Sequence, residues 1–73
     1  MRLSGLNKGQ SGVISQLQPS SIQLKLLEMG FIPGIKVSVE HIAPFGDPIL
    51  VRVSESLVSL RLNEAETITV DIL

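Results

Sequence analysis

The stretch Leu26-Leu27-Glu28-Met29-Gly30-Phe31-Ile32-Pro33-Gly34-Ile35-Lys36-Val37-Ser38-Val39 contains the change of pattern that decides the fold. Up to Gly30, apolar residues recur at the spacing of one helical face, and the members of this stripe are Ile22, Leu26 and Met29. From Ile35 onward, apolar and polar residues alternate, which is typical of a strand with one face in water. The sequence therefore predicts a helix followed directly by strands.

Both ends of the helix carry recognisable signals. The segment 19–21, Pro-Ser-Ser, precedes it, and Ser20 is placed to accept hydrogen bonds from the first turn, with Gln23 completing a capping box. At the other end Gly30 suits the left-handed conformation, which places Phe31 over Leu26, and Pro33 prevents the helix from resuming. We expect the helix to lie between Ser20 and Gly30.

Outward from this centre, the remaining chain consists of short alternating segments separated by turn residues. Glycines punctuate the first dozen residues, where Leu3 and Leu6 anchor a short turn. The alternation slips at Ile42, which suggests a bulge or the end of the strand near Ala43-Pro44. Asn63 is predicted to cap one helical turn ending at Glu66. The predicted strands are 12–17, 35–42, 49–53, 58–62 and 68–72. These elements predict a mainly β fold: one domain, residues 1–73, forming a small five-stranded, partly open barrel with one helix after the first strand and a helical turn before the last.

Composition excludes several classes of function. The chain of 73 residues has no cysteine, so neither disulfides nor thiolate metal sites are available. Its net charge of −1 and its two aromatic residues, Phe31 and Phe45, argue against nucleic acid, which requires a basic face or stacking platforms. No stretch approaches the roughly 20 apolar residues that span a bilayer, and no secretory signal is visible. We expect a cytoplasmic protein without direct membrane insertion.

Motifs for catalysis are missing from the sequence. None of the six glycines forms a phosphate-binding loop, and no cofactor is indicated. His41 is the only histidine, and no oxyanion-hole motif accompanies it. Glu64 and Glu66 flank the predicted helical turn and face different directions, which favours solvated or capping roles. The sequence indicates a protein that is not an enzyme.

Metal binding is an open alternative. His41 and Asp47 are the candidate ligands, with Glu40 and Asp71 as further oxygen donors, but none of them has the spacing of a helical metal site. The simpler interpretation places His41 partly buried at the barrel rim. It also lets Asp47 order its own turn through a hydrogen bond to nearby backbone.

Protein binding has a clearer physical basis. Leu24 lies nearly opposite Ile22 on the helix, so it is expected to remain largely in water, and Leu27 also falls outside the buried stripe. Beside Lys25, these leucines form an apolar anchor with a charged rim. Isolated surface leucines are also ordinary in monomeric proteins, so the two interpretations compete.

Two segments of the chain resemble the FeoA family of bacterial ferrous iron transport proteins. The helix-ending segment 26–34 is similar to one family motif, and the loop Ala43-Pro44-Phe45-Gly46-Asp47-Pro48 is similar to the family's central loop. Leu60-Arg61, Glu64-Ala65 and the segment 68–70 extend the similarity over nearly the whole chain. The resemblance implies an SH3-like barrel in the cytoplasm that assists the membrane-embedded transporter FeoB, whose cytosolic part contains a GTP-binding domain. Leu24 departs from the polar or basic residue usual at this position.

These observations define the expected sites and function. The partner-binding residues are predicted to be Leu24, Lys25, Leu27, Glu28, Met29 and Phe31. The structural motifs are expected to depend on Gly30, Pro33, Gly34, Pro44, Gly46, Asp47 and Pro48. We expect a non-catalytic accessory of ferrous iron uptake that binds and modulates FeoB. Through this partner the chain would lie at the inner face of the membrane. The same helix face is also suited to pairing with a second copy of the chain. The alternative is a domain that binds or senses transition metals directly.

Overall fold

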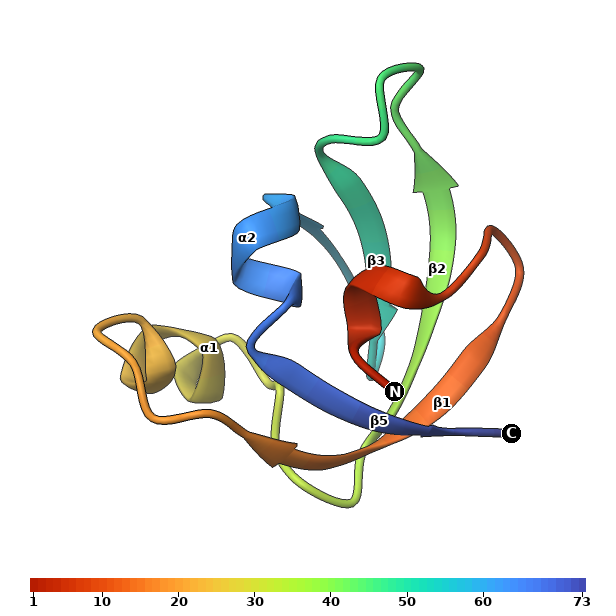
Figure 1. Cartoon of the computed structure of the whole chain (residues 1–73). Helices are drawn as coiled ribbons and strands as arrows, with labels where there is room; N and C mark the ends of the chain where they lie inside the picture. The colour runs from red at the N-terminus through yellow and green to blue at the C-terminus, as the bar shows by residue number, and fades with distance from the viewer.

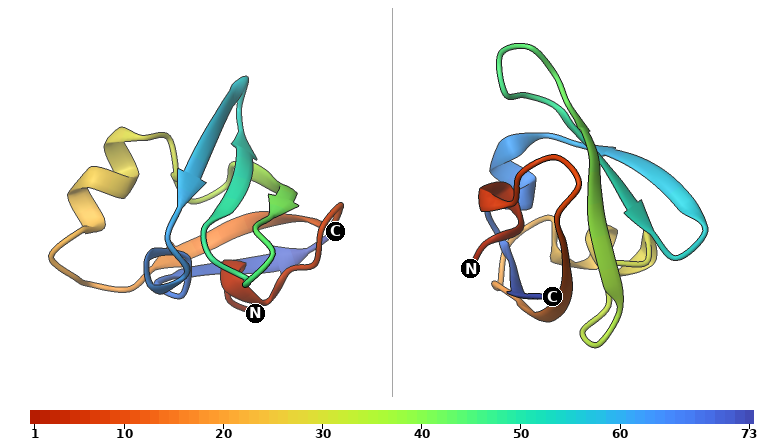
Figure 2. Two further views of the ribbon diagram at one scale, coloured as in Figure 1. Left: turned by 90° about the horizontal axis from the view of Figure 1, so that it is seen from above. Right: turned by 90° about the vertical axis from the view of Figure 1, so that its right-hand side faces the viewer.

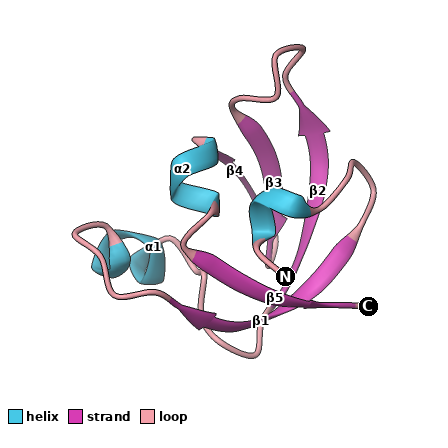
Figure 3. Ribbon diagram, in the orientation of Figure 1, coloured by secondary structure: helices cyan, strands magenta, loops and turns pink.

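The computed structural model describes all 73 residues. They form one curved antiparallel sheet accompanied by short helices (Figure 1). The strands follow the order β4-β3-β2-β1-β5, so the sheet does not close into a complete barrel. Figure 3 distinguishes the helices from the strands. The elements are a 3₁₀ turn η1 (Leu3–Gly5), β1 (Ser11–Leu17), α1 (Gln23–Glu28), β2 (Lys36–Ile42), β3 (Ile49–Val53), β4 (Ser56–Leu60), α2 (Leu62–Ala65) and β5 (Ile68–Ile72). The mainly β, partly open architecture predicted from the sequence is confirmed.

Two bulges curve the sheet. One shifts the β1–β5 register between Ile14 and Gln16, and the other shifts the β2–β3 register between Val39 and His41. A bulge inserts an extra residue on one strand, which bends that strand and increases its twist. The second bulge lies where the alternation slips before Ile42, so this prediction is confirmed. The bending lets five short strands wrap around one core.

The core consists of aliphatic side chains and one phenylalanine. Fifteen buried hydrophobic residues form a single cluster, to which every strand and both ends of the chain contribute. Phe31 is the largest of them and is fully buried. Leu3 and Leu6 are buried as well, which confirms that they anchor the first turn. Ile72, the last residue of β5, is 49% exposed although it follows the alternation of the buried Ile68 and Val70.

Both α-helices begin differently from the sequence prediction. The helix α1 starts at Gln23 because Ser20 closes a turn instead: its hydroxyl accepts from the Ile22 amide, and its carbonyl accepts from the Gln23 amide. The predicted capping box is therefore wrong. Asn63 lies inside α2 and does not cap it. The cap is instead supplied by Glu64, whose carboxylate accepts from the Arg61 amide at 2.9 Å.

Candidate functional site

The C-terminus of α1 is fixed by the predicted glycine motif. Gly30 has φ +101°, the Phe31 amide donates to the Leu26 carbonyl, and the Gly30 amide donates to the Leu27 carbonyl. This pair of hydrogen bonds defines the Schellman motif, which satisfies the last free carbonyls of a helix. The motif directs Phe31 back into the core, which confirms the prediction that it packs at this end. The helix is thus held at a defined angle to the barrel.

The outer face of α1 carries one exposed apolar side chain among charged ones. Leu24 is 69% exposed, and Lys25 and Glu28 are exposed beside it on the same short helix. The Lys25 ammonium lies 4.0 Å from the Glu64 carboxylate, which links α1 to α2 across the surface. The Lys25 side chain is 67% exposed, whereas that of Glu64 is only 19% exposed. Because the contact is long and one partner is in solvent, the pair adds little stability.

Three of the six predicted partner-binding residues are less accessible than the sequence suggested. Phe31 is fully buried, so it is a core residue and cannot contact a partner directly. Leu27 and Met29 are partly buried and pack against the core. The sequence placed Leu27 outside the buried stripe, but the helix has fewer than two turns, and the barrel covers a wider arc of it than the stripe predicts. Leu24, Lys25 and Glu28 remain fully available.

The loop between β2 and β3 is held at its base and open at its tip. The Ala43 amide donates to the Pro48 carbonyl, and the Gly46 amide donates to the Ala43 carbonyl at 2.7 Å, with Gly46 at φ +85°. This turn leaves Phe45 at the tip, where the residue is 98% exposed. The loop extends beyond the body of the sheet (Figure 1). Its backbone therefore depends on the glycine and on the contact between its two ends.

Asp47 performs a different task from the predicted one. Its carboxylate accepts from the Leu62 amide at 3.1 Å and lies 3.9 Å from the Arg61 guanidinium. It therefore binds the N-terminus of α2, 15 residues away along the chain, and does not order its own turn. A carboxylate is favourable at this position because the first amides of a helix lack partners within the helix. The interaction joins the β2–β3 loop to α2.

The candidate metal ligands are not brought together. His41 is exposed, which corrects the expectation that it is partly buried, and Glu40 is engaged by the Arg52 guanidinium at 3.3 Å. No group of three or more histidine, aspartate or glutamate side chains lies close enough to hold an ion. With Asp47 bound to α2, a metal ion at His41 would lack a preassembled set of protein ligands.

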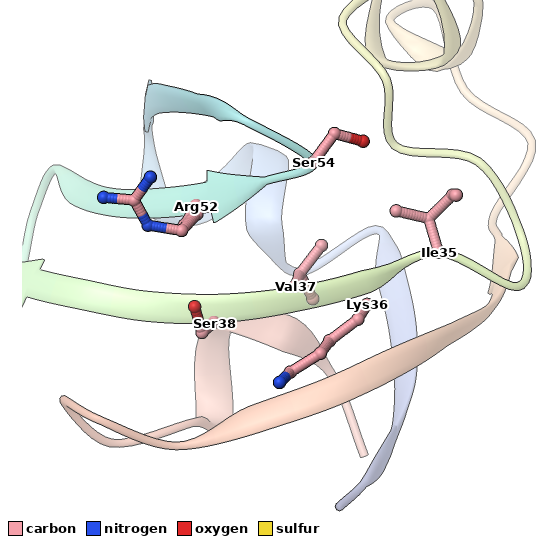
Figure 4. Close-up of a pocket in the computed structure, with 6 residues that line it drawn as sticks. All are labelled: Ile35, Lys36, Val37, Ser38, Arg52 and Ser54. Atoms are coloured by element: carbon pink, nitrogen blue, oxygen red, sulfur yellow. The ribbon is translucent and has the colours of Figure 1, made fainter.

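A shallow depression on the outer face of β2 and β3 was missed by the sequence reasoning (Figure 4). It has a volume of about 380 Å³ and is lined by Ile35, Lys36, Val37, Ser38, Arg52 and Ser54. The outward positions of two alternating strands could have indicated it, but only with their pairing known, since Ser38 lies opposite Arg52. Because Glu40 already engages Arg52, the basic character of the depression is reduced.

The curved five-stranded sheet, the helix after its first strand and the helical turn before its last define a small SH3-like barrel. The FeoA domain model matches residues 1–72. The chain belongs to the FeoA family. None of its helices is long and apolar enough to cross a membrane.

Three known proteins illustrate this relationship. The Fe(2+) transport protein A/Fe(2+) transporter FeoB fusion protein of Porphyromonas gingivalis is 36% identical over the whole of this chain, which spans 9% of the fusion protein. The solution structure of FeoA from Chlorobium tepidum has 38% identity and a TM-score of 0.92, covering 100% of this chain and 70% of that one. Zinc-complexed FeoA from Stenotrophomonas maltophilia, described as a prokaryotic SH3 domain protein, has 34% identity and a TM-score of 0.87, covering 97% and 89%.

Proposed function

We propose that this chain is a non-catalytic cytoplasmic accessory of ferrous iron uptake, which binds and modulates a FeoB-type transporter through protein–protein contacts. The observation that carries the proposal is the outer face of α1, where Leu24 is 69% exposed between charged neighbours. The partner is the cytosolic GTP-binding domain of the transporter, which brings the chain to the inner face of the membrane.

The fusion protein of Porphyromonas gingivalis supports the choice of partner. In that protein a FeoA segment and a FeoB transporter belong to one polypeptide. Covalent linkage raises the effective concentration of one module near the other to about the millimolar range, so even a weak contact between them is populated. A separate chain must reach the same contact by its own affinity, which requires an exposed anchor such as Leu24.

The geometry of α1 supports Leu24 as this anchor. Complete burial of a leucine stabilises a complex by about 1.5–3 kcal/mol, and most of this gain is still available at an exposed residue. Charged side chains at the rim add orientation more than affinity, and Lys25 and Glu28 offer both signs of charge. The Schellman motif and the buried Leu26 hold the helix rigid, so little conformational entropy is lost on docking.

The remainder of the chain supports a binding role without catalysis. His41 is exposed and forms no hydrogen bond or ion pair with another side chain, so no serine or threonine is activated by it. The carboxylate of Glu64 caps α2, and that of Glu66 lies 3.9 Å from the Arg2 guanidinium. Both carboxylates are thus occupied in structural contacts.

The test compares two leucines of equal exposure. Leu24→Glu places a charge at the proposed anchor, and Leu73→Glu places the same charge at a residue that is 70% exposed but lies at the end of the chain. Binding to the purified cytosolic domain of a FeoB-type transporter is measured by biolayer interferometry. We expect affinity to fall by about tenfold or more for Leu24→Glu only. If both variants bind with equal affinity and their circular dichroism spectra are unchanged, the face around Leu24 is not the binding surface.

Direct metal binding is the second candidate, because the Stenotrophomonas maltophilia relative was solved in complex with zinc. In this chain the ligands would have to include His41 and Asp47, and the latter would have to leave the Leu62 amide. Calorimetric titration with Zn²⁺ or Fe²⁺, together with the transporter-binding assay, separates the two candidates. A metal-binding domain must bind the ion, whereas an accessory must bind the transporter.

A further inference from the structure

The two edge strands of the sheet differ in whether another segment of the chain covers them. Strand β5 forms one edge, and the N-terminal segment covers it: the Val70 amide donates to the Met1 carbonyl at 2.7 Å, and Arg2 forms a bridge with Thr69. Strand β4 forms the other edge and pairs only with β3. The β3–β4 hairpin projects from the body of the molecule in both views of Figure 2. The chain thus has one uncovered edge.

The uncovered edge lacks the features that normally prevent strands from associating. Natural edge strands carry charges, proline or bulges that block pairing with another chain. Strand β4 reads Ser-Leu-Val-Ser-Leu, with no charge and no proline, and its pairing with β3 is regular. Ser56, Leu57 and Ser59 are exposed, and Leu57 is a large apolar residue with 50% exposure. Sequence and exposure both favour addition of a further strand.

The geometry of the hairpin identifies the free backbone groups. Val53 pairs with Ser56 across a two-residue turn that begins at Ser54, with φ +56°. In such hairpins the closing pair is hydrogen bonded, and bonded pairs then alternate along the strands. Ser56 and Val58 therefore direct their backbone groups toward β3, whereas Leu57 and Ser59 direct theirs outward. No turn, loop or side-chain hydrogen bond uses the amide or carbonyl of Leu57 or Ser59.

We infer that β4 is a self-association edge that takes the β4 strand of a second copy of this chain, antiparallel and centred on Val58. In this register Leu57 lies opposite Ser59 of the second copy, and the two residues exchange backbone hydrogen bonds in both directions. Two-fold symmetry repeats the pair on the other side of Val58. The exposed Leu57 side chains of the two copies become diagonal neighbours and cover one another.

Charge complementarity selects this partner and this register. The residue before β4 is Glu55 and the residue after it is Arg61, both exposed. The centred antiparallel register places Glu55 opposite Arg61 of the second copy at each end of the paired strands. Glu55 has no ion pair within the chain, and Arg61 has only a long, solvent-exposed contact with Asp47. A parallel arrangement would instead place Glu55 beside Glu55, which is unfavourable.

The test exchanges these charges and measures self-association by sedimentation velocity over a range of concentrations. Glu55→Lys alone opposes two positive side chains at each end, and Arg61→Glu alone opposes two negative ones. We expect each variant to associate about tenfold more weakly than the unmodified chain. An equimolar mixture of the two variants restores both attractive pairs and should form a heterodimer about as stable as the original dimer. Failure of the mixture to recover would overturn the inference.

A second variant tests the backbone contact. Ser59→Pro removes an outward N–H, and an edge strand tolerates proline at such a position. We expect a folded monomer by circular dichroism and sedimentation. The control Ser15→Ala removes only an exposed hydroxyl on β1 that donates to the Thr69 carbonyl at the opposite edge, and it should keep the dimer. The inference is overturned if the unmodified chain is monomeric at millimolar concentration. It is also overturned if the transporter domain, and not a second copy of the chain, binds along β4. None of these outcomes depends on Leu24, so the inference and the proposed function fail separately.

Discussion

Replacing Phe31 by alanine should nearly unfold the protein. Phe31 is fully buried and is the largest side chain in the core. Removal of a buried phenylalanine costs about 3–5 kcal/mol, because contacts are lost and a cavity remains. A chain of 73 residues has a free energy of unfolding of about 4–11 kcal/mol at the usual value per residue. The loss is therefore a large part of the total stability.

Urea denaturation followed by far-ultraviolet circular dichroism measures this loss, since the chain has no tryptophan for fluorescence. At a slope of about 1 kcal/mol per molar urea, typical of a small domain, the midpoint should fall by about 3 M or the variant should be unfolded in water. Phe31→Leu preserves most of the volume and should cost less than about 1.5 kcal/mol. If Phe31→Ala lowers the free energy of unfolding by less than about 1 kcal/mol and also weakens transporter binding, Phe31 is not buried and belongs to the contact surface.

Three further substitutions test other parts of the structure. Asp47→Ala should lower the thermal midpoint by about 4–8 °C, because a capping hydrogen bond to the Leu62 amide is worth about 1 kcal/mol; an unchanged melt would mean that this contact is not formed. Gly12→Ala should lower the free energy of unfolding, measured by urea denaturation, by about 1–3 kcal/mol, because its methyl group would lie 2.9 Å from the Asp71 carbonyl oxygen. An unchanged free energy of unfolding would show that β5 can shift to make room at no cost. His41→Ala should leave calorimetric zinc binding unchanged, whereas loss of micromolar binding would favour the metal-binding alternative.

Local signals predicted the fold because they act over a few residues. Gly30 with Pro33 determined where α1 ends, and the alternation from Ile35 onward predicted β2, which begins at Lys36 and contains a bulge. These features follow from backbone conformation and side-chain periodicity, which neighbouring residues specify. The cap of α2 does not follow from such a local signal, because Asn63 lies inside the helix and the acceptors at its start are Glu64 and the Asp47 carboxylate from a distant loop.

The candidate site was only partly predictable for a related reason. Leu24 is exposed as expected, since its position on the helix alone places it away from the core. The extent to which Leu27 and Phe31 are covered depends on how the barrel approaches α1, which no local pattern specifies. The free edge at β4 could not be predicted from the sequence either, because it depends on the strand order and on the bridge by which Arg2 covers β5.

The proposed function requires that this chain binds a FeoB-type transporter. The most direct measurement is a calorimetric titration of the unmodified chain into the cytosolic GTP-binding domain of such a transporter, in its GDP state and with a GTP analogue. The proposal predicts saturable binding in at least one nucleotide state, with an affinity of about micromolar and a negative heat-capacity change from burial of the apolar surface around Leu24. An absence of binding in both states, at concentrations of about a millimolar, would contradict it.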